Sequence, residues 1–258
     1  MNIAVVGTGY VGLVAGVCLA DAGHNVYCVD NDTKKIDQLN AGHVPIYEPG
    51  LSEILQRAQN RICFTTDLKT AVQKCEVIFL AICTPEGEDG HVQLSPLMEV
   101  VGHICAHTPA ARFLVIKSTV PVGTTAKIKT VCMQKSKFPI EVINNPEYLR
   151  EGTAVDDFMH PDRVVVGSTS GEAQSLMRQL YEPFLRNGKP MLFMDATSAE
   201  LTKYAANAFL SIKISFINEL ALLCDKVGAD ITQVRTGFTS DHRINPAFFN
   251  PGIGFGGS

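Results

Sequence analysis

The chain has 258 residues, enough for one large domain or for two unequal ones. Hydrophobic residues make up 46% and charged residues 19%, which is typical of a folded globular protein and excludes a disordered or collagen-like chain. The 22 Lys and Arg against 26 Asp and Glu give a net charge of -4, so binding to a nucleic-acid backbone is not expected.

Targeting, membrane and metal signals are also weak, and the cytoplasm is the expected compartment. The start lacks the basic region and long apolar core of a signal peptide. The most apolar stretch, 212–223, is interrupted by Lys213, Asn218 and Glu219, so we expect no bilayer-spanning segment of roughly 18 to 20 residues. The eight cysteines form no C-x-x-C pair and the histidines show no ligand spacing, which predicts small buried thiols, without disulfides or a metal site.

Short apolar runs alternate with helical patterns through about the first 195 residues. Strands are expected at 2–6, 25–29, 77–82, 113–117, 140–143, 164–166 and 191–194. Helices are expected at 10–22, 33–41, 51–59, 96–107, 124–133 and 171–184. Most strands are apolar throughout, and helices separate them, which predicts a Rossmann-like, doubly wound, mainly parallel α/β sheet.

The last helical pattern, 198–227, is more than twice the length of an average helix of about 12 residues. Thr197 and Glu200 stand at capping-box spacing at its start, and Gly228 is expected to end it. At about 1.5 Å per residue this helix runs on the order of 45 Å, too long for one layer of a compact domain. We therefore expect a first domain at 1–196, with the long helix and the beginning of a helical central domain at 197–258.

A glycine-rich motif follows the first expected strand and opens the first expected helix, where residues 7–12 read Gly-Thr-Gly-Tyr-Val-Gly. In this setting Gly7 permits a tight turn, Gly9 lets the backbone approach a pyrophosphate, and Gly12 allows close packing of helix on sheet. The phosphates then meet a helix N-terminus. A bare motif indicates only a turn, but its place between strand and helix predicts dinucleotide binding.

Asp30 stands at the end of the second expected strand, roughly 20 residues after the motif. A carboxylate there can bind both hydroxyls of an adenosine ribose and repels a 2′-phosphate, which predicts NAD rather than NADP. Lys34 and Lys35 follow closely. They either soften that preference or belong to a solvated helix face.

Hydroxyl side chains follow two further strands. Thr84 comes after the strand expected at 77–82, and Ser118 and Thr119 come after the one at 113–117. Ligands of open α/β sheets lie at the carboxyl ends of the strands, so these hydroxyls are expected near the same crevice as the glycine motif. Each of them, taken singly, also fits the cap of the following helix.

Two polar pairs allow a catalytic or a merely structural interpretation. Glu147 and Glu151 would share a face if 144–152 is helical, suited to proton transfer or ligand positioning, or they belong to a surface ion-pair turn. Lys203 and Asn207 stand one turn apart on the long helix. They present an ammonium and an amide together, or form only a polar stripe.

The last part of the chain carries two more features. Residues 241–258 are rich in glycine and include Arg243, which fits a loop whose backbone approaches a phosphate or sugar ligand, or a flexible linker. The apolar face of the helix at 198–227 is larger than the short following segment can cover. It predicts a homodimer formed through this helix.

Taken together, the motifs resemble the nucleotide-sugar dehydrogenases over the whole chain. They are NIAVVGTGYVGLV, VDND, PIYEPGL, the Thr-Pro junction, KSTVPVGTT, NPEYLREGTA, ELTKYAANAFLSIKISFINEL, VGADI, DHRI and GFGGS, in the family's order. The KYAANAF and DHRI segments look more like the members that oxidise UDP-glucose than those that oxidise GDP-mannose.

The resemblance implies roles for individual residues. NAD binding is implied for Gly7, Gly9, Tyr10, Val11, Gly12, Asp30, Lys35, Thr84, Thr119 and Glu151. Catalytic roles are implied for Glu147 as a general base, for Lys203 and Asn207 as oxyanion-stabilising groups, and for Thr119. Binding of the nucleotide sugar is implied for Glu147, Tyr148, Leu149, Arg150, Lys203, Asn207, Arg243, Phe248, Gly254, Phe255, Gly256 and Gly257, with Arg243 similar to a residue lent to the neighbouring subunit.

The reaction implied by this resemblance is the four-electron oxidation of UDP-glucose to UDP-glucuronate, with two NAD reduced, through a cysteine thiohemiacetal and thioester. In the family the cysteine follows GFGGS directly, and none of the eight cysteines holds that position. The acidic partner after that cysteine and the C-terminal nucleotide-binding domain have no counterpart either. We therefore expect an N-terminal portion that is inactive alone.

Other interpretations remain. The sugar nucleotide is alternatively GDP-mannose or a UDP-N-acetylhexosamine, and the chain is alternatively a non-catalytic NAD-binding or dimerisation module. A 3-hydroxyacid or hydroxyacyl-CoA dehydrogenase shares the early pattern and a long helix. It does not explain NPEYLREG or GFGGS.

Overall fold

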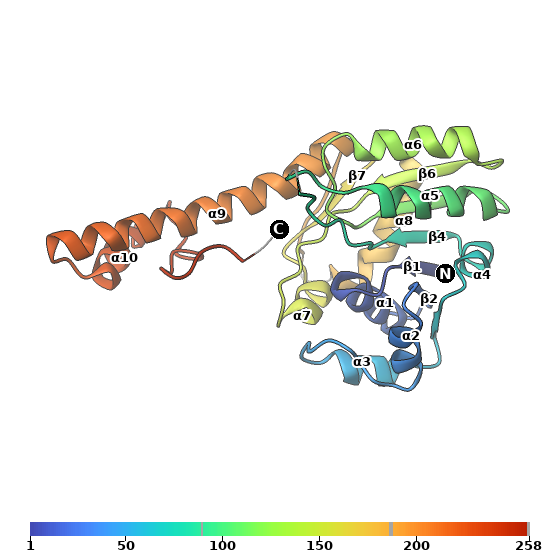
Figure 1. Ribbon diagram of the computed structural model, residues 1–258, viewed down its shortest axis with the longest axis horizontal. Coiled ribbons are helices and arrows are strands. Elements are labelled where there is room, and N and C mark those ends of the chain that lie inside the picture. The colour runs from blue at the N-terminus through green and yellow to red at the C-terminus, as the bar shows by residue number, and fades with distance from the viewer. Residues whose placement is uncertain (89, 186–187, 257–258) are drawn as a thin grey trace. The chain divides into compact units, whose positions relative to one another are not determined.

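The computed structural model describes residues 1–88, 90–185 and 188–256 (Figure 1). Contacts divide the chain into two compact units, Met1–Leu201 and Thr202–Ser258. In the described part of the first unit, eight strands form one sheet in the order β3-β2-β1-β4-β5-β6-β7-β8. The strands are β1 Asn2–Val6, β2 Asn25–Val29, β3 Ile62–Thr65, β4 Val77–Leu80, β5 Arg112–Ile116, β6 Ile140–Asn144, β7 Val164–Gly167 and β8 Met191–Met194.

The helices follow the alternation expected from the sequence. They are α1 Tyr10–Asp21, α2 Thr33–Asn40, α3 Leu51–Ala58, α4 Leu68–Lys74, α5 Ser95–His107, α6 Thr124–Lys135, α7 Ala154–Met159, α8 Gly171–Tyr181, the 3-10 turn Glu182–Phe184, α9 Ala196–Val227 and α10 Ile231–Thr239. Only β6 and β7 pair antiparallel; the other neighbouring strands of the described sheet are parallel. The doubly wound, mainly parallel sheet is confirmed.

The strands bury both faces because successive side chains alternate between two cores. On β1, Ile3 and Val5 belong to the same core as residues of α1, α2, α3, α7 and α8, whereas Ala4 and Val6 belong to the core that includes residues of α4, α5 and α6. Figure 1 shows α5 and α6 on one side of the sheet and α1, α2 and α3 on the other. This two-sided burial explains why the strands read as continuous apolar runs.

Four short elements were not predicted from the sequence: β3, α4, α7 and α10. Strand β3 lies at the sheet edge, and only Phe64 of its four residues is buried. Helices α4 and α7 have seven and six residues, which is below the length at which a helical period can be recognised. Helix α10 has only nine residues, and although Ile231, Val234 and Phe238 stand at helical spacing, none of its residues is fully buried.

The long helix begins two residues earlier than expected, and the capping box is wrong. Asp195 caps α9 instead, because its carboxylate accepts hydrogen bonds from the Ser198 backbone N–H at 2.9 Å and from the Ser198 hydroxyl at 2.6 Å. Glu200 is turned to other partners. The helix ends at Gly228, which has the positive φ of +72° that glycine adopts at little cost, as expected.

Helix α9 is long and apolar enough, by length and composition, to cross a membrane. This property alone does not overturn the expectation that no segment spans a bilayer, because core helices of soluble proteins share it. The helix is still interrupted by polar residues. Some of those residues bind within the second unit. The Lys213 ammonium donates to the Asn245 carbonyl at 2.9 Å and lies 4.4 Å from the centre of the Phe249 ring, and Asn218 accepts from the Gly252 N–H at 2.9 Å.

The cysteines are free thiols, but not all are buried. Six of them are buried, as expected, whereas Cys63 and Cys83 are exposed. Burial raises the pKa of Cys18 and of Cys75 to about 12 each, so these two stay protonated near neutral pH. They behave as small apolar side chains of the core.

Candidate functional site

The predicted residues of the first unit lie in loops that leave the carboxyl ends of parallel strands. The chain runs from β1 outward through β2 to β3, and then continues from β4 on the other side of β1. This reversal of strand order next to β1 is the topological switch point at which open α/β sheets bind ligands. The loops after β1, β2, β4, β5 and β6 therefore form one candidate site.

The glycine motif is shaped by contacts that only glycine allows. Gly7 has a φ of +97°, and a Cβ there would meet the Ala81 carbonyl oxygen at 2.4 Å; a Cβ on Gly12 would lie 1.8 Å from the Gly7 carbonyl oxygen. At Gly9, by contrast, a Cβ would meet nothing within 4 Å. Gly7 and Gly12 thus make the turn and the close packing, and Gly9 leaves an open approach to the backbone.

The start of α1 suits an anion. Gly9 is its N-cap and supplies no side-chain hydrogen bond to the first turn. The first backbone N–H groups of a helix lack partners within the helix and carry the positive end of its dipole. The Tyr10 hydroxyl is buried, and among the described residues it has no hydrogen-bond partner. These groups, the open face at Gly9 included, fit a dinucleotide pyrophosphate and its neighbouring ribose.

Asp30 is held as an ionised acceptor directly beside this motif. Its Oδ2 accepts from the Thr8 backbone N–H at 2.8 Å, from the Thr8 hydroxyl at 2.7 Å and from the Lys35 ammonium at 3.1 Å. Its Oδ1 accepts from the Asp32 N–H at 3.1 Å. Burial alone raises the pKa of Asp30, but the hydrogen bonds outweigh it and lower that pKa below its usual range.

Lys35 therefore is not simply part of a solvated helix face, whereas Lys34 is exposed. The ammonium of Lys35 pairs with the carboxylate that excludes a 2′-phosphate, so its charge is largely compensated where that phosphate would lie. This pairing is compatible with a preference for NAD.

The hydroxyls after β4 and β5 tie two loops together. Thr84 donates through its hydroxyl to the Thr119 carbonyl at 2.8 Å, and the Ser118 hydroxyl donates to the Ile82 carbonyl at 2.7 Å. Neither Thr84 nor Thr119 caps a helix: the N-caps of α5 and α6 are Leu94 and Gly123. Both threonines lie at the candidate site, with the Thr84 hydroxyl fixing the backbone of the Thr119 loop.

Glu200 closes the other end of that loop, a contact that the sequence did not indicate. Only 2% of it is exposed, and its carboxylate accepts from the Gly123 N–H at 2.6 Å, the Thr125 N–H at 2.7 Å and the Thr125 hydroxyl at 2.6 Å. A carboxylate from the start of α9 thus supplies the cap that α6 lacks. No local pattern pairs residues more than seventy positions apart.

The segment at 145–150 is irregular, so the helical interpretation of 144–152 is wrong. Glu147 instead accepts from the Leu149 N–H at 2.7 Å within the loop. Arg150 donates through its backbone and guanidinium to Asp157. The ring of Tyr148 lies 3.9 Å from the Arg163 guanidinium carbon. Glu147 and Glu151 are loop residues near the carboxyl end of β6, without a shared helix face.

Tyr10 links this loop to the glycine motif. Burial, and then the charges of Glu48, Glu151, Asp157 and Glu147 in that order, raises the pKa of the Tyr10 hydroxyl, so it remains a neutral group. The two loop glutamates are thus close enough to the start of α1 to act on it electrostatically. The first unit brings together the residues predicted for NAD binding in these loops.

The other predicted residues belong to the second unit. Lys203 is buried and Asn207 partly buried, one turn apart on α9. Arg243 is exposed and its guanidinium donates to Asp241. Phe248 has a φ of +67°, which is unusual for a residue with a side chain. Gly254, Phe255 and Gly256 are described, whereas the expected contribution of Gly257 lies outside the described residues.

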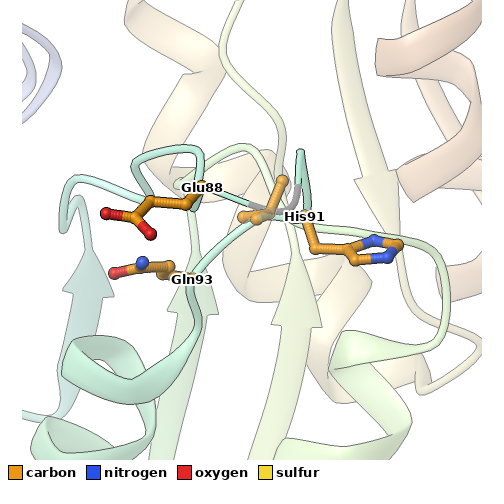
Figure 2. A pocket seen from close by; sticks show the side chains of 4 residues that line it. Glu88, His91 and Gln93 are labelled. Atoms are coloured by element: carbon orange, nitrogen blue, oxygen red, sulfur yellow. The ribbon is translucent and has the colours of Figure 1, made fainter.

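One open pocket lies in the loop between β4 and α5, beside the bridge between Glu86 and Val92. It measures about 480 Å³ and is lined by Glu88, His91, Val92 and Gln93. Figure 2 shows the side chains of Glu88 and Gln93 next to one another, with His91 directed away from them. None of these residues was predicted from the sequence as part of a site.

Comparison with known proteins gives consistent matches over both units. Residues 1–185 match the NAD binding domain of the UDP-glucose/GDP-mannose dehydrogenase family, and residues 197–258 match its central domain. The chain is 46% identical to a UDP-glucose 6-dehydrogenase of Pseudomonas aeruginosa, over all of this chain and 58% of that protein.

Two solved structures show the same fold. A UDP-glucose dehydrogenase from Pyrobaculum islandicum has a TM-score of 0.94 at 37% identity, covering 99% of this chain and 60% of that one. A GDP-mannose dehydrogenase from Pseudomonas aeruginosa has a TM-score of 0.89 at 32% identity, covering all of this chain and 61% of that one. The chain thus spans about three fifths of the length of these relatives.

Proposed function

Because the chain belongs to the UDP-glucose/GDP-mannose dehydrogenase family, we propose that it provides the NAD site of a nucleotide-sugar 6-dehydrogenase that oxidises UDP-glucose to UDP-glucuronate. The observation that carries this proposal is the ionised Asp30 beside the glycine motif at the switch point of the sheet. The carboxylate would accept from the hydroxyls of the adenosine ribose, and the start of α1 would hold the pyrophosphate.

NAD, when bound, accepts the hydride removed from the sugar carbon, and the full reaction reduces two NAD per sugar. The residues of the chain bind this cofactor and orient it. Gly7, Gly9, Tyr10, Val11, Gly12, Asp30, Lys35, Thr84, Thr119 and Glu151 are proposed to hold the cofactor. The bond between Thr84 and the Thr119 loop supports a role for both near the nicotinamide half.

For the chemical steps we propose Glu147 as the base that activates water in thioester hydrolysis, and Thr119 as a further catalytic residue. Lys203 and Asn207 would donate to the negative oxygen of the tetrahedral intermediates, a role that suits fixed donors in a site from which water is excluded. Burial of Lys203 supports this, since a partly desolvated ammonium stabilises an oxyanion more strongly than a solvated one.

The nucleotide-sugar side is proposed to include Glu147, Tyr148, Leu149, Arg150, Lys203, Asn207, Arg243, Phe248, Gly254, Phe255 and Gly256. Arg150 and Arg243 are exposed and each donates to an aspartate, Asp157 and Asp241 respectively. The Arg243 pair is largely exposed and contributes little to stability, so this arginine can exchange its aspartate for a phosphate at small cost. The Asp157 side chain is only 12% exposed, so Arg150 would leave a mostly buried carboxylate behind. Arg243 is the residue proposed to reach the site of a neighbouring subunit.

We further propose that the protein forms a homodimer through α9. We also propose that it acts in the cytoplasm without a membrane, and that its functional domains are 1–196 and 197–258. The exposed apolar side chains of α9 include Phe209, Ile212, Phe216, Leu222, Leu223 and Val227. Side chains of this size, exposed on successive turns, favour burial against a second copy. Sedimentation that shows only monomer at high concentration would count against the dimer.

UDP-glucose is proposed over GDP-mannose because the relative named for UDP-glucose is 46% identical and the one named for GDP-mannose is 32% identical. The test is NADH formation by the full gene product with a panel of both substrates and a UDP-N-acetylhexosamine. Two NADH per UDP-glucose are expected. Preferred oxidation of another sugar nucleotide would contradict the proposed substrate. Absence of NADH formation with every substrate would contradict the proposed enzymatic activity.

A further inference from the structure

Glu48 is a buried carboxylate to which the proposed function assigns no role. It lies between α2 and α3, and only 6% of it is exposed. Its Oε2 accepts from the Gly152 N–H at 2.9 Å and its Oε1 from the Ala154 N–H at 2.6 Å. These donors are 104 and 106 positions away in the chain. One side chain thus ties the segment before α3 to the loop that ends at α7.

The two hydrogen bonds make this burial tolerable. A carboxylate removed from water is strongly destabilising unless its oxygens receive hydrogen bonds, and bonds to an ionised acceptor are about twice as strong as neutral ones. Ala154 is the first residue of α7, and Thr153, its N-cap, gives no side-chain hydrogen bond. Glu48 therefore performs, from a distant segment, the capping that the local sequence omits.

The loop that Glu48 holds is the one that carries Glu147 and Glu151. Leu149 of the same loop packs against the core that also receives Tyr10, the residue after Gly9. The carboxylates of Glu48, Glu151 and Glu147 all act on the Tyr10 hydroxyl. The loop and the start of α1 are therefore neighbours, and Glu48 bonds to the loop at its far end.

We propose that Glu48 is a positioning residue that fixes the 145–153 loop beside the glycine motif, so that the carboxylates of this loop face the nicotinamide half of a bound NAD. The proposal rests on the proposed NAD function. The adenosine and the pyrophosphate are proposed to be bound by Asp30 and the glycine motif, which receive no hydrogen bond from Glu48. Loss of Glu48 is therefore expected to weaken binding of the nicotinamide half more than binding of the adenosine half.

This division gives a readout that a merely structural role does not move. ADP-ribose contains every part of NAD except the nicotinamide, so loss of loop positioning weakens NAD and leaves ADP-ribose unchanged. In Glu48→Gln one backbone N–H faces an amide NH2 instead of an acceptor, and the loop loses one charge-assisted bond. Glu53→Gln, on the exposed face of α3, removes the same charge nearby and is the matched control.

Calorimetry of both ligands on wild type, Glu48→Gln and Glu53→Gln is the test. For Glu48→Gln the NAD dissociation constant is expected to rise about tenfold, a factor that corresponds to one such bond, while that of ADP-ribose changes less than about twofold. The control is expected to match wild type for both ligands. Equal weakening of both ligands, or no change in either, overturns the proposal.

The same experiment separates this inference from the function on which it rests. Absence of NAD binding by the wild type overturns the proposed function and this inference with it, whereas NAD bound equally by wild type and Glu48→Gln overturns this inference alone. If Glu48→Gln does not fold, Glu48→Asp keeps the charge on a shorter stem. For Glu48→Asp, the affinity for NAD relative to ADP-ribose is expected to lie below that of the wild type. If a folded Glu48→Asp has the same relative affinity as the wild type, the proposal is overturned.

Discussion

Two parts of the candidate site are built in different ways. Around the glycine motif, the functional groups come from one β-α-β unit, and Asp30 accepts hydrogen bonds from residues within 22 positions of it. The Thr119 loop and the 145–153 loop instead depend on two buried carboxylates, Glu200 and Glu48, whose donors are 75 to 106 positions away. The first region can be predicted from local sequence, whereas the second depends on contacts that form only in the completed fold.

The comparison also separates two uses of a carboxylate. Asp30 also accepts hydrogen bonds from backbone N–H groups, but it stands next to the glycine motif and 10% of its side chain remains exposed. Glu200 and Glu48 have their oxygens committed to backbone N–H groups and are nearly inaccessible. Substitutions of the three carboxylates should therefore differ in kind: loss of ligand at Asp30, and loss of stability or loop position at the other two.

The largest effect is expected at Gly12. Gly12→Ala places a Cβ 1.8 Å from the Gly7 carbonyl oxygen, and backbone in a tight turn cannot move away cheaply. We expect a loss of more than about 3 kcal/mol in the free energy of unfolding, measured in urea. Gly9→Ala, whose Cβ meets nothing, should keep its stability and bind NAD more weakly. Equal stability of the two variants would contradict the steric account.

Glu200→Gln tests the distant cap of α6. Replacing the carboxylate leaves at least one of its buried backbone donors facing an amide group, which costs about 1 to 3 kcal/mol in the free energy of unfolding. Glu99→Gln, exposed on α5, is the control and should change stability by less than about 0.5 kcal/mol. If urea unfolding shows no difference between these variants, the capping role of Glu200 is wrong.

A pH titration of stability sharpens the description of Asp30. The folded pKa is lowered, so Asp30 stabilises the folded state fully above its unfolded pKa of about 3.9, and this contribution is lost as the pH falls through the lowered folded pKa. The stability difference between wild type and Asp30→Asn should therefore be constant near neutral pH and shrink below about pH 4. A difference independent of pH down to about pH 2 would argue against an ionised Asp30.

The smallest effect is expected at Lys35. Lys35→Ala removes an ion pair that is partly exposed, so NAD affinity should fall by no more than about threefold. NADP binding should not improve, because the Asp30 carboxylate remains. A marked gain in NADP affinity of Lys35→Ala, measured by calorimetry, would contradict this, because it would show that Lys35 disfavours NADP.

Local sequence predicts the sheet well because its strands are buried on both faces. β1, β2 and β8 have the expected bounds, and most other strands and helices shift by only one or two residues. Within the glycine motif, the close packing of Gly12 against Gly7 and the start of the helix are determined by neighbouring residues and can be predicted locally. The close approach of Gly7 to the Ala81 carbonyl comes from the loop after β4 and depends on the completed fold.

The errors have local physical causes too. Pro146 lacks an N–H and biases Asn145 away from helical geometry, while the Glu147 side chain bonds to the Leu149 N–H and competes with helix formation. The i, i+4 spacing of two glutamates therefore carried no helix. At α9, Asp195 was the better cap than Thr197, and Glu200 at its expected spacing served a different helix.

The central claim is that Asp30 and the glycine motif bind NAD. Calorimetry with NAD on wild type, Asp30→Ala and the exposed control Asp37→Ala tests it most directly. We expect clear binding by wild type and Asp37→Ala, with a loss of affinity of about 10- to 100-fold in a folded Asp30→Ala, the range for a lost bond to a charged group. Undetectable binding by folded wild type, or equal affinity in all three proteins, would contradict the account.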